Sequence, residues 1–435
     1  MLRNQRIDHV SSPFAGHLHP QLDLAQQLRD RCELQIRFLS TPTARRAVEL
    51  CDFPMVELLS NRSHIVTGIA NAPRRVGSNP WRLLGQLRDN VSMMDQLVAE
   101  LREQWTRDRP DLVIVDFAVP VAGLLAQSLG IPWWTSFTAV CAMETPDGVP
   151  GYLGGWRPKA GWVGRSRDLV GRSFVRTFKR CMHGLFRRQL KRLGIPRVYR
   201  ADGYETIYSQ EKILALRPRE FEFPRAWPTW MEFIGPLTAG PPYPHRAPVF
   251  TEGKPHVLIS LGTHVGWAKQ SAEQLMRRVA QAMPDYEFHF SHGNATGDYG
   301  EDLQNFHVYA YFPYDQYAGR YAASINHVGT GVMFSCLRQG VPILAWPQDF
   351  DQFDHTARIV HHQLGLRLRP SVPHIVEDLR RLQTDAVIQS NVNNMQRIIA
   401  STNPADRVIE LLDRQFAPTT SSGLPRSGQG DNVRK

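Results

Sequence analysis

Two histidines near the amino terminus are the first residues in this chain that could do chemistry. His17 and His19 lie in the stretch FAGHLHPQLDLAQQL, residues 14–28, beside a glycine and a proline. An imidazole titrates near neutral pH, so either ring could take a proton from a substrate. Both could equally be polar loop residues without a catalytic role, and their spacing alone does not decide between the two interpretations.

A second group of residues, in the carboxyl-terminal half, could bind a phosphorylated ligand. In the stretch HVGTG, Gly329 and Gly331 follow an expected strand and open an expected helix, so backbone N–H groups could approach a phosphate, and His327 could add a donor. Further along, Asp351 and Gln352 offer a carboxylate and an amide, which suit the vicinal hydroxyls of a sugar. The alternatives are a plain strand-to-helix connection and an aspartate that caps a helix.

The elements around the two histidines predict where they lie. Residues 6–12 and 33–40 have the alternating, β-branched character of strands. Between them, apolar residues recur at helical spacing: Leu22, Leu24, Ala25 and Leu28. Pro20 suits a first helical turn, so we expect the histidines to precede this helix. In such a βαβ unit ligands bind at the carboxyl ends of the strands, where the loop 12–17 must lie.

The alternation of strands and helices continues on both sides of a proline-rich stretch. Residues 112–116, about 118–129 and 131–136 predict a strand, a helix and a strand, and a similar pattern restarts at HVLISLGT, residues 256–263. We therefore predict an α/β protein with an amino-terminal domain over 1–216 and a carboxyl-terminal domain over 256–416. The segment 217–255 is the expected linker, and the polar tail 417–435 is expected to be disordered.

Composition restricts the class of protein. Of the 435 residues, 42% are hydrophobic and 21% are charged, as in an ordinary globular protein. The five cysteines are scattered without a CxxC pair, so neither a disulfide framework nor a zinc site is indicated. The chain has no apolar run of membrane-spanning length, and its first residues lack the apolar core of a signal peptide. We expect a cytoplasmic protein.

The net charge of +10 is concentrated in one segment, residues 157–200, where fourteen Lys or Arg face a single acid, Asp168. Aromatic and aliphatic residues are interleaved with these cations. We expect a helix whose apolar face packs on its own domain. The alternative is a basic amphipathic helix in peripheral contact with an anionic membrane. Nucleic-acid binding is not indicated, because no known module accompanies the charge.

Several motifs together resemble the inverting, nucleotide-sugar-dependent glycosyltransferases of the UDP-glycosyltransferase and macrolide glycosyltransferase type. The motifs are GHLHP, LVIVDF, FIGPL, SLGT and HVGTG followed by GVPILAWPQDFDQ, and their order covers nearly the whole chain, to about Phe416. The resemblance implies the GT-B fold. In that fold two Rossmann-like domains face each other across a cleft, the first binds the acceptor, the second binds the donor, and a last helix crosses back to the first domain.

The resemblance also implies roles for particular residues. His17 matches the general base of the family, Asp116 matches its orienting carboxylate, and His19 is then a bystander. The donor would be bound by residues that match family motifs: Thr263, Tyr311, His327, Gly329, Thr330, Gly331, Asp351 and Gln352. The only co-substrate implied is the nucleotide sugar, and no metal or other cofactor is required. Ser335 stands where many relatives carry a ribose-binding glutamate, and this difference weakens the case for UDP specifically.

The acceptor site is inferred from the residues themselves. Trp133, Trp134 and Phe137 come at the end of an expected first-domain strand, where a binding pocket needs apolar walls. These rings could equally belong to the core. Together with the reaction that the resemblance implies, these apolar walls lead us to predict transfer of a hexose or deoxyhexose from a UDP- or dTDP-sugar to a hydroxyl of an apolar small molecule. The alternatives are a lipid glycosyltransferase at a membrane surface and an inactive relative that serves as a binding partner.

Overall fold

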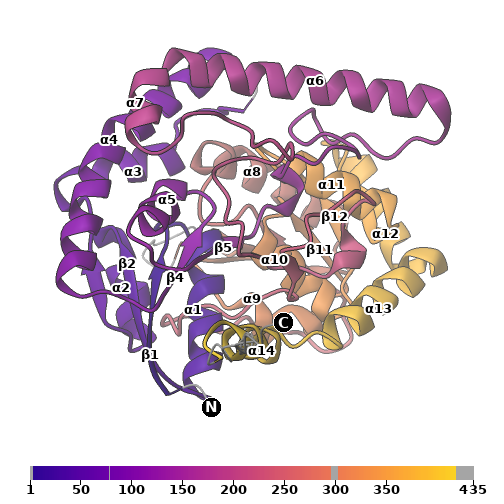
Figure 1. The fold of residues 1–435 in the computed structure, drawn as a ribbon. Coiled ribbons are helices and arrows are strands. Elements are labelled where there is room, and N and C mark those ends of the chain that lie inside the picture. The colour runs from indigo at the N-terminus through magenta and orange to yellow at the C-terminus, as the bar shows by residue number, and fades with distance from the viewer. Residues whose placement is uncertain (1–2, 78, 295–301, 418–435) are drawn as a thin grey trace, which may run out of the picture.

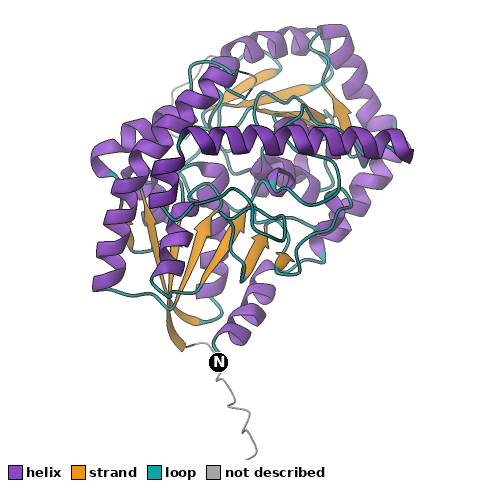
Figure 2. Ribbon diagram, turned by 45° about the horizontal axis from the view of Figure 1, so that its top comes forward, coloured by secondary structure: helices purple, strands orange, loops and turns teal. Residues whose placement is uncertain are grey.

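Two parallel β-sheets form the centre of the molecule, one in each half of the chain (Figures 1 and 2). The computed structural model describes residues 3–77, 79–294 and 302–417. The strands of the first sheet are β1 (Arg3–Val10), β2 (Glu33–Ser40), β3 (Met55–Glu57), β4 (Leu112–Asp116), β5 (Trp133–Phe137), β6 (Lys212–Ala215) and β7 (Met231–Phe233). Those of the second sheet are β8 (His256–Ser260), β9 (Glu287–Ser291), β10 (Phe306–Tyr309), β11 (Ala323–Asn326), β12 (Ile343–Ala345) and β13 (Gly365–Arg367).

The helices follow the strands in the order expected of a doubly wound fold. In the first half they are α1 (Ala15–Arg29), α2 (Arg45–Leu50), α3 (Ser63–Ala70), α4 (Pro80–Arg107), α5 (Pro120–Ser128), α6 (Gly161–Leu185) and α7 (Arg187–Arg192). In the second half they are α8 (Gly266–Ala282), α9 (Tyr314–Tyr317), α10 (Thr330–Arg338), α11 (Gln352–His361), α12 (Val372–Thr384), α13 (Ala386–Ala400) and α14 (Pro404–Gln415).

The strand orders place a ligand crevice in each half. The first sheet runs β3-β2-β1-β4-β5-β6-β7 and the second runs β10-β9-β8-β11-β12-β13. In each, the order reverses beside the first strand of that half, between β1 and β4 and between β8 and β11. In open parallel sheets this switch point, at the carboxyl ends of the strands, is where ligands bind. The predicted α/β class of two Rossmann-like units is confirmed.

Two of the differences between predicted and observed element boundaries change the description of the site and of the first sheet. Helix α1 begins at Ala15, because the Phe14 carbonyl accepts from the N–H groups of His17 and Leu18, both at 2.8 Å. The histidines therefore lie inside the helix, and Pro20 lies within it rather than in its first turn. Strand β7 pairs with β6, so the first sheet extends to Phe233, inside the segment expected to be a linker.

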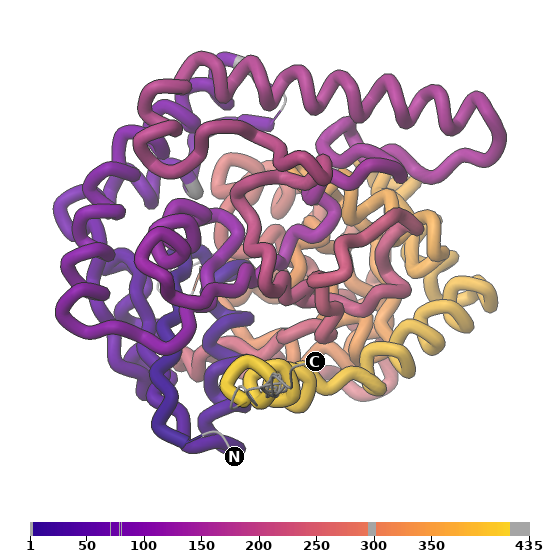
Figure 3. The backbone as a smooth tube through the Cα atoms, in the orientation of Figure 1, coloured from indigo at the N-terminus to yellow at the C-terminus, as the bar shows by residue number. Residues whose placement is uncertain are grey.

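The last helix returns to the first half of the molecule, as Figure 3 shows for the yellow end of the chain. Val408, Leu411 and Leu412 of α14 belong to the same buried cluster as Leu18 and Leu22 of α1. The predicted crossing back of the carboxyl-terminal helix is confirmed. Apart from Ala417, the tail expected to be disordered lies outside the described residues.

Helix α6 reverses the expected orientation of its faces. Its buried residues are Gly164, Asp168, Gly171 and Val175, so its inward face consists of two glycines, an aspartate and a single aliphatic side chain. Two of its cations also point inward, since Arg176 lies 3.2 Å from Glu144 and Lys179 lies 2.7 Å from Glu205. The exposed large aliphatic and aromatic side chains of this helix point outward instead, so the expectation that the apolar face packs on its own domain is wrong for them, although Val175 packs inward. In the described part of the chain, no helix is long and apolar enough to cross a membrane.

A buried ion cluster joins the two halves behind the cleft. Glu222 accepts from Arg217 at 2.7 Å and from Arg358 of α11 at 2.6 and 2.9 Å. Burial alone would raise the pKa of Glu222, but the neighbouring guanidinium groups lower it to about 2. Arg217 also donates to the Thr138 carbonyl beyond β5 and lies 3.3 Å from Nε2 of His355 in α11. The ends of β5 and β6 are thereby tied to α11.

The Glu222→Gln variant should unfold more easily by about 3 kcal/mol or more, because two buried guanidinium groups lose their shared anion. The difference from wild type should be largest above pH 4.5 and should shrink as the pH falls toward 2, where wild-type Glu222 itself becomes protonated. Urea unfolding at several pH values measures this. The control Glu377→Gln removes an exposed partner of Arg369 and should change stability by less than about 1 kcal/mol. Equal effects of the two variants would contradict the assigned role of the cluster.

Candidate active site

The first half of the site is a histidine–carboxylate pair at the switch point of the first sheet. His17, near the start of α1, has its Nδ1 3.0 Å from both carboxylate oxygens of Asp116, the last residue of β4. Asp116 also accepts from the Ser12 hydroxyl at 2.6 Å, the Ser12 N–H at 3.2 Å and the Ala118 N–H at 3.1 Å. Because a carboxylate can only accept, Nδ1 carries the proton and Nε2 is left with a free lone pair.

The electrostatics of this pair favour a basic imidazole. Burial opposes a charge on His17, but the carboxylates of Asp116 and the more distant Asp351 outweigh that cost, so the pKa of His17 is raised above 6.5. For Asp116, burial alone would raise the pKa, but His17 and the hydrogen bonds from Ser12 and Ala118 lower it overall. The aspartate is therefore ionised wherever the histidine titrates, and it stabilises any proton that the ring takes up.

Aromatic rings fix the plane of His17. Phe117 stacks on the imidazole with ring centres 5.1 Å apart, and Phe14 meets it edge-on at 5.8 Å. Phe137 lies behind Phe117 at 4.7 Å and so supports this wall from the core. Trp133, Trp134 and Phe137 are themselves buried in hydrophobic clusters, and none of the three lines the cavity described below.

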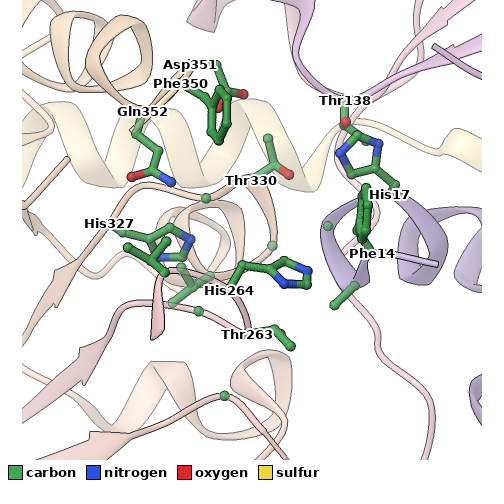
Figure 4. Close-up of a pocket in the computed structure, with 18 of the residues that line it drawn as sticks. Phe14, His17, Thr138, Thr263, His264, His327, Thr330, Phe350, Asp351 and Gln352 are labelled. Carbon is green, nitrogen blue, oxygen red and sulfur yellow. The ribbon is translucent and has the colours of Figure 1, made fainter. Parts of the chain in front are cut away.

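The second half of the site lies on two loops at the switch point of the second sheet. The loop after β8 carries Thr263 and His264, and the loop after β11 carries His327 and Gly329. Figure 4 shows the side chains of Thr263, His264 and His327 across the cavity from His17 and Phe14. The His327 ring lies between Gly262 and Gly329, where an added Cβ would come within 2.5 and 2.3 Å of it. Glycine is required at both positions because the imidazole occupies the space of a side chain.

The polar residues at the start of α11 have two different roles: some face the cavity, and one forms hydrogen bonds to the first half of the chain. Gln352 accepts from the N–H groups of Gln348 at 2.7 Å and Asp349 at 3.1 Å, which fixes its carbonyl oxygen and leaves its amide nitrogen for a ligand. Asp349 connects the two halves, because its carboxylate accepts hydrogen bonds from the N–H groups of Val76 at 2.6 Å and Gly77 at 2.8 Å in the first half. Asp351 occupies the N-cap position but makes no capping hydrogen bond.

A cavity of about 470 Å³ lies between the two sets of residues. Its lining includes His17 and every residue predicted to bind a donor: Thr263, Tyr311, His327, Gly329, Thr330, Gly331, Asp351 and Gln352. His19 and Ser335 also line it. A smaller cavity of about 200 Å³ adjoins it, shares Phe14, Ile69 and Ala118 with it, and is otherwise lined mainly by apolar side chains such as Met93 and Leu97.

His264 is a residue of this cavity that sequence reasoning missed. Its Nδ1 lies 3.1 Å from Oδ1 of Asn71, while its Nε2 is buried with no partner among the described residues. Burial, together with His17 and Lys269, lowers its pKa to about 4, so the ring is neutral at pH 7. The signal available in the sequence was its place directly after SLGT, but only the fold brings it opposite His17.

One trio of side chains has the spacing of metal ligands in the described part of the chain: Cys141, Asp351 and His355. Burial raises the pKa of the Cys141 thiol, which keeps that sulfur protonated. The guanidinium of Arg217 also lies 3.3 Å from Nε2 of His355. A thiol and a fixed positive charge at this position oppose cation binding, so the trio does not fit a metal site well.

Comparisons with known proteins point to one class of enzyme. No protein-family model matches the chain. The chain is 25% identical over 416 residues to zeaxanthin glucosyltransferase of Pantoea ananas, covering 92% of this chain and 94% of that enzyme. Among solved structures, the glycosyltransferase of kitacinnamycin matches with a TM-score of 0.71 at 21% identity, over 95% of this chain and 100% of that one. The glycosyltransferase VinC in complex with DTDP matches with a TM-score of 0.62 at 17% identity, over 94% and 99%.

These matches confirm the predicted fold and resemblance. The chain has the GT-B fold, with two Rossmann-like units facing each other across a cleft. Its curated full-length relatives are glycosyltransferases. The identities lie at or below about one quarter, so which groups carry the chemistry in this chain must be argued from its own cavity.

The Asp116→Asn variant should move the pKa of His17 from above 6.5 to below it, because the burial that lowers this pKa remains while the carboxylate that raises it is lost. Titration of the histidine ring protons by NMR measures the shift. His9 is a control within the same sheet: burial lowers its pKa to about 4, and its partner Gln21 is untouched by the change. An unchanged His17 titration would show that the pair does not act as described.

Proposed function

We propose that this chain is an inverting glycosyltransferase that moves a hexose or deoxyhexose from a UDP- or dTDP-sugar to a hydroxyl of an apolar small molecule. The observation that carries the proposal is the His17–Asp116 pair, which faces the loops at the carboxyl ends of β8 and β11 across one cavity. One side of the cavity thus offers a base, which can activate an acceptor hydroxyl. The other side offers backbone N–H groups and uncharged hydrogen-bond donors, which can stabilise a phosphorylated leaving group.

The proposed reaction is a single displacement. Nε2 of His17 takes the proton from the acceptor hydroxyl while Asp116 stabilises the imidazolium that forms. The acceptor oxygen bonds to the anomeric carbon from the side opposite the nucleotide, and the bond from that carbon to the phosphate oxygen breaks. The electron pair leaves with the nucleoside diphosphate, so the configuration at the anomeric carbon is inverted.

The donor side stabilises the charge that develops on the diphosphate. Thr330 and Gly331 begin helix α10, whose unpaired N–H groups and positive dipole end face the cavity beside His327. Thr263 adds a hydroxyl from the neighbouring loop. We assign the sugar hydroxyls to Asp351 and to the amide nitrogen of Gln352, and stacking of the nucleobase to Tyr311. The nucleotide sugar is thus a co-substrate rather than a resident cofactor.

The acceptor side is apolar around the base. Phe14 and Phe117 frame His17, and the adjoining cavity of about 200 Å³ offers room for an apolar part of the acceptor. We assign the acceptor walls to these residues and to Ile69, in place of Trp133, Trp134 and Phe137. An inactive relative acting only as a binding partner is disfavoured, because the base, its carboxylate and the donor residues all line or support one cavity.

The His17→Ala variant should lose about 10² to 10⁴-fold in kcat, because the general base is removed while the donor residues stay in place. Nucleotide binding, measured by calorimetry with dTDP, should change little. His19→Ala is the matched control: His19 lines the same cavity and sits in the same helix, but burial lowers its pKa to about 4 and none of the hydrogen bonds among the described residues joins it to an acid. A larger loss for His19→Ala than for His17→Ala would reverse the assignment.

The affinity for the nucleotide should depend little on the ribose 2′-hydroxyl, because Ser335 offers no carboxylate to bind that hydroxyl. We expect UDP and dUDP to compete with a sugar donor within about tenfold of each other, since a serine at position 335 cannot supply the hydrogen bond to a charged group that contributes about 1.5–3 kcal/mol. Inhibition constants for UDP, dUDP and dTDP separate the hydroxyl from the base methyl. A preference for UDP over dUDP above about a hundredfold would contradict this expectation.

A further inference from the structure

Helix α6 exposes an apolar stripe along its length. Its exposed large hydrophobic residues are Trp162, Val163, Leu169, Val170, Phe174, Phe178 and Leu185. Five of these, from Val163 to Leu185, are spaced by seven, four, four and seven positions, which places them on one face of a helix. We call this set of seven residues the α6 outer face. Trp162, Val170 and Phe174 are 73, 68 and 64% exposed, so the face is not partly hidden core.

The α6 outer face lies on the outside of the molecule. Figures 1 and 2 show α6 as a long rod at the surface, with one end extending beyond the neighbouring elements. Its opposite face packs closely on the protein at Gly171, where an added Cβ would come within 2.7 Å of Trp156. The ion pairs of Arg176 and Lys179 also attach this face to the rest of the molecule. The helix is therefore fixed in the orientation that exposes its apolar residues. Isolated exposed apolar residues are common, but seven along one helix mark an interaction surface.

Four cations with no acidic partner among the described residues lie on α6 and on the adjoining helix α7. Arg165 lies on α6 itself, and Arg187, Arg188 and Lys191 lie on α7 at its end; all four are exposed. None of them takes part in an ion pair among the described residues. A second copy of this chain would bring the same cations together and be repelled. A partner that is apolar inside and negatively charged at its surface matches both features, and a bilayer with anionic headgroups has this chemistry.

We propose that α6 and α7 form a peripheral membrane-binding surface. The α6 outer face enters the boundary between headgroups and acyl chains, and the cations of α7 bind the headgroup phosphates. The segment before α6 carries Tyr152, which lines the main cavity, so a short stretch of chain connects the cavity wall to the membrane-binding helix. Binding to lipid does not rest on the proposed transfer reaction, and it is measured without turnover.

Flotation with vesicles tests the proposal. The full chain is mixed with vesicles of phosphatidylcholine alone or of equal parts phosphatidylcholine and phosphatidylglycerol, and floated through a density gradient. We expect flotation with the anionic vesicles only, weakened by salt. A protein that stays at the bottom with both lipids would overturn the proposal. The proposal would also be overturned if ultracentrifugation showed that the protein self-associates and this form floated with neither kind of vesicle.

Two triple variants assign the binding to these helices. Leu169→Ser, Val170→Ser and Phe174→Ser together remove the centre of the apolar stripe, and Arg187→Gln, Arg188→Gln and Lys191→Gln together remove three cations. Each variant should weaken binding to anionic vesicles about a hundredfold or more, since each buried apolar side chain and each cation near the surface contributes substantially. Thermal unfolding checks that both variants fold, because arginine stems can also pack on apolar surface.

Matched controls lie on the other half of the chain. Val249→Ser, Leu303→Ser and Val387→Ser remove exposed apolar residues of similar exposure, and Arg278→Gln, Arg380→Gln and Arg414→Gln remove three exposed cations. Both controls should float like wild type. Equal loss in the controls and the α6 and α7 variants would overturn the assignment, because binding would then follow overall charge and hydrophobicity rather than this surface.

Discussion

A buried carboxylate, Glu222, sets the relation between the two halves of the molecule. It is shared by Arg217, which follows β6 of the first sheet, and Arg358 of α11 in the second half. A charge in this interior is stable only when both guanidinium groups are in place. His355, beside Arg217, donates from Nδ1 to the Val328 carbonyl at 2.9 Å, so the loop after β11 is held by the same network. The same network therefore positions both the loop after β11 and the end of β5.

The site follows from that constraint. Each sheet ends in a switch point, and the cluster holds the two switch points face to face, so that His17 and the loops after β8 and β11 line one cavity. Asp349 adds a second connection by accepting from the N–H groups of Val76 and Gly77; a side chain at position 77 would come within 2.5 Å of its carboxylate. In the proposed reaction, this arrangement gives each half one role: proton removal in the first half and charge stabilisation in the second.

Local patterns predicted more of the fold than of the site. The strands 33–40 and 112–116 were expected at the bounds they have, the first from its alternating character and the second from its short apolar run. Strand β5 is buried along its whole length, which explains why Trp133 and Trp134 were misjudged: the residue pattern cannot tell a core face from a cavity face in such a strand. For α6 the pattern indicated two faces but not which one is inward, and that was decided by Glu144 and Glu205, which lie elsewhere in the chain.

The anomeric configuration of the product tests the central claim most directly, because a single attack on the anomeric carbon from the face opposite the nucleotide inverts it. The purified chain is incubated with an α-linked nucleotide glucose and a hydroxylated aromatic acceptor, and the isolated glycoside is analysed by proton NMR. A single displacement with His17 as base predicts a β-linked product. An α-linked product would contradict the account, since it would require a different path at the anomeric carbon.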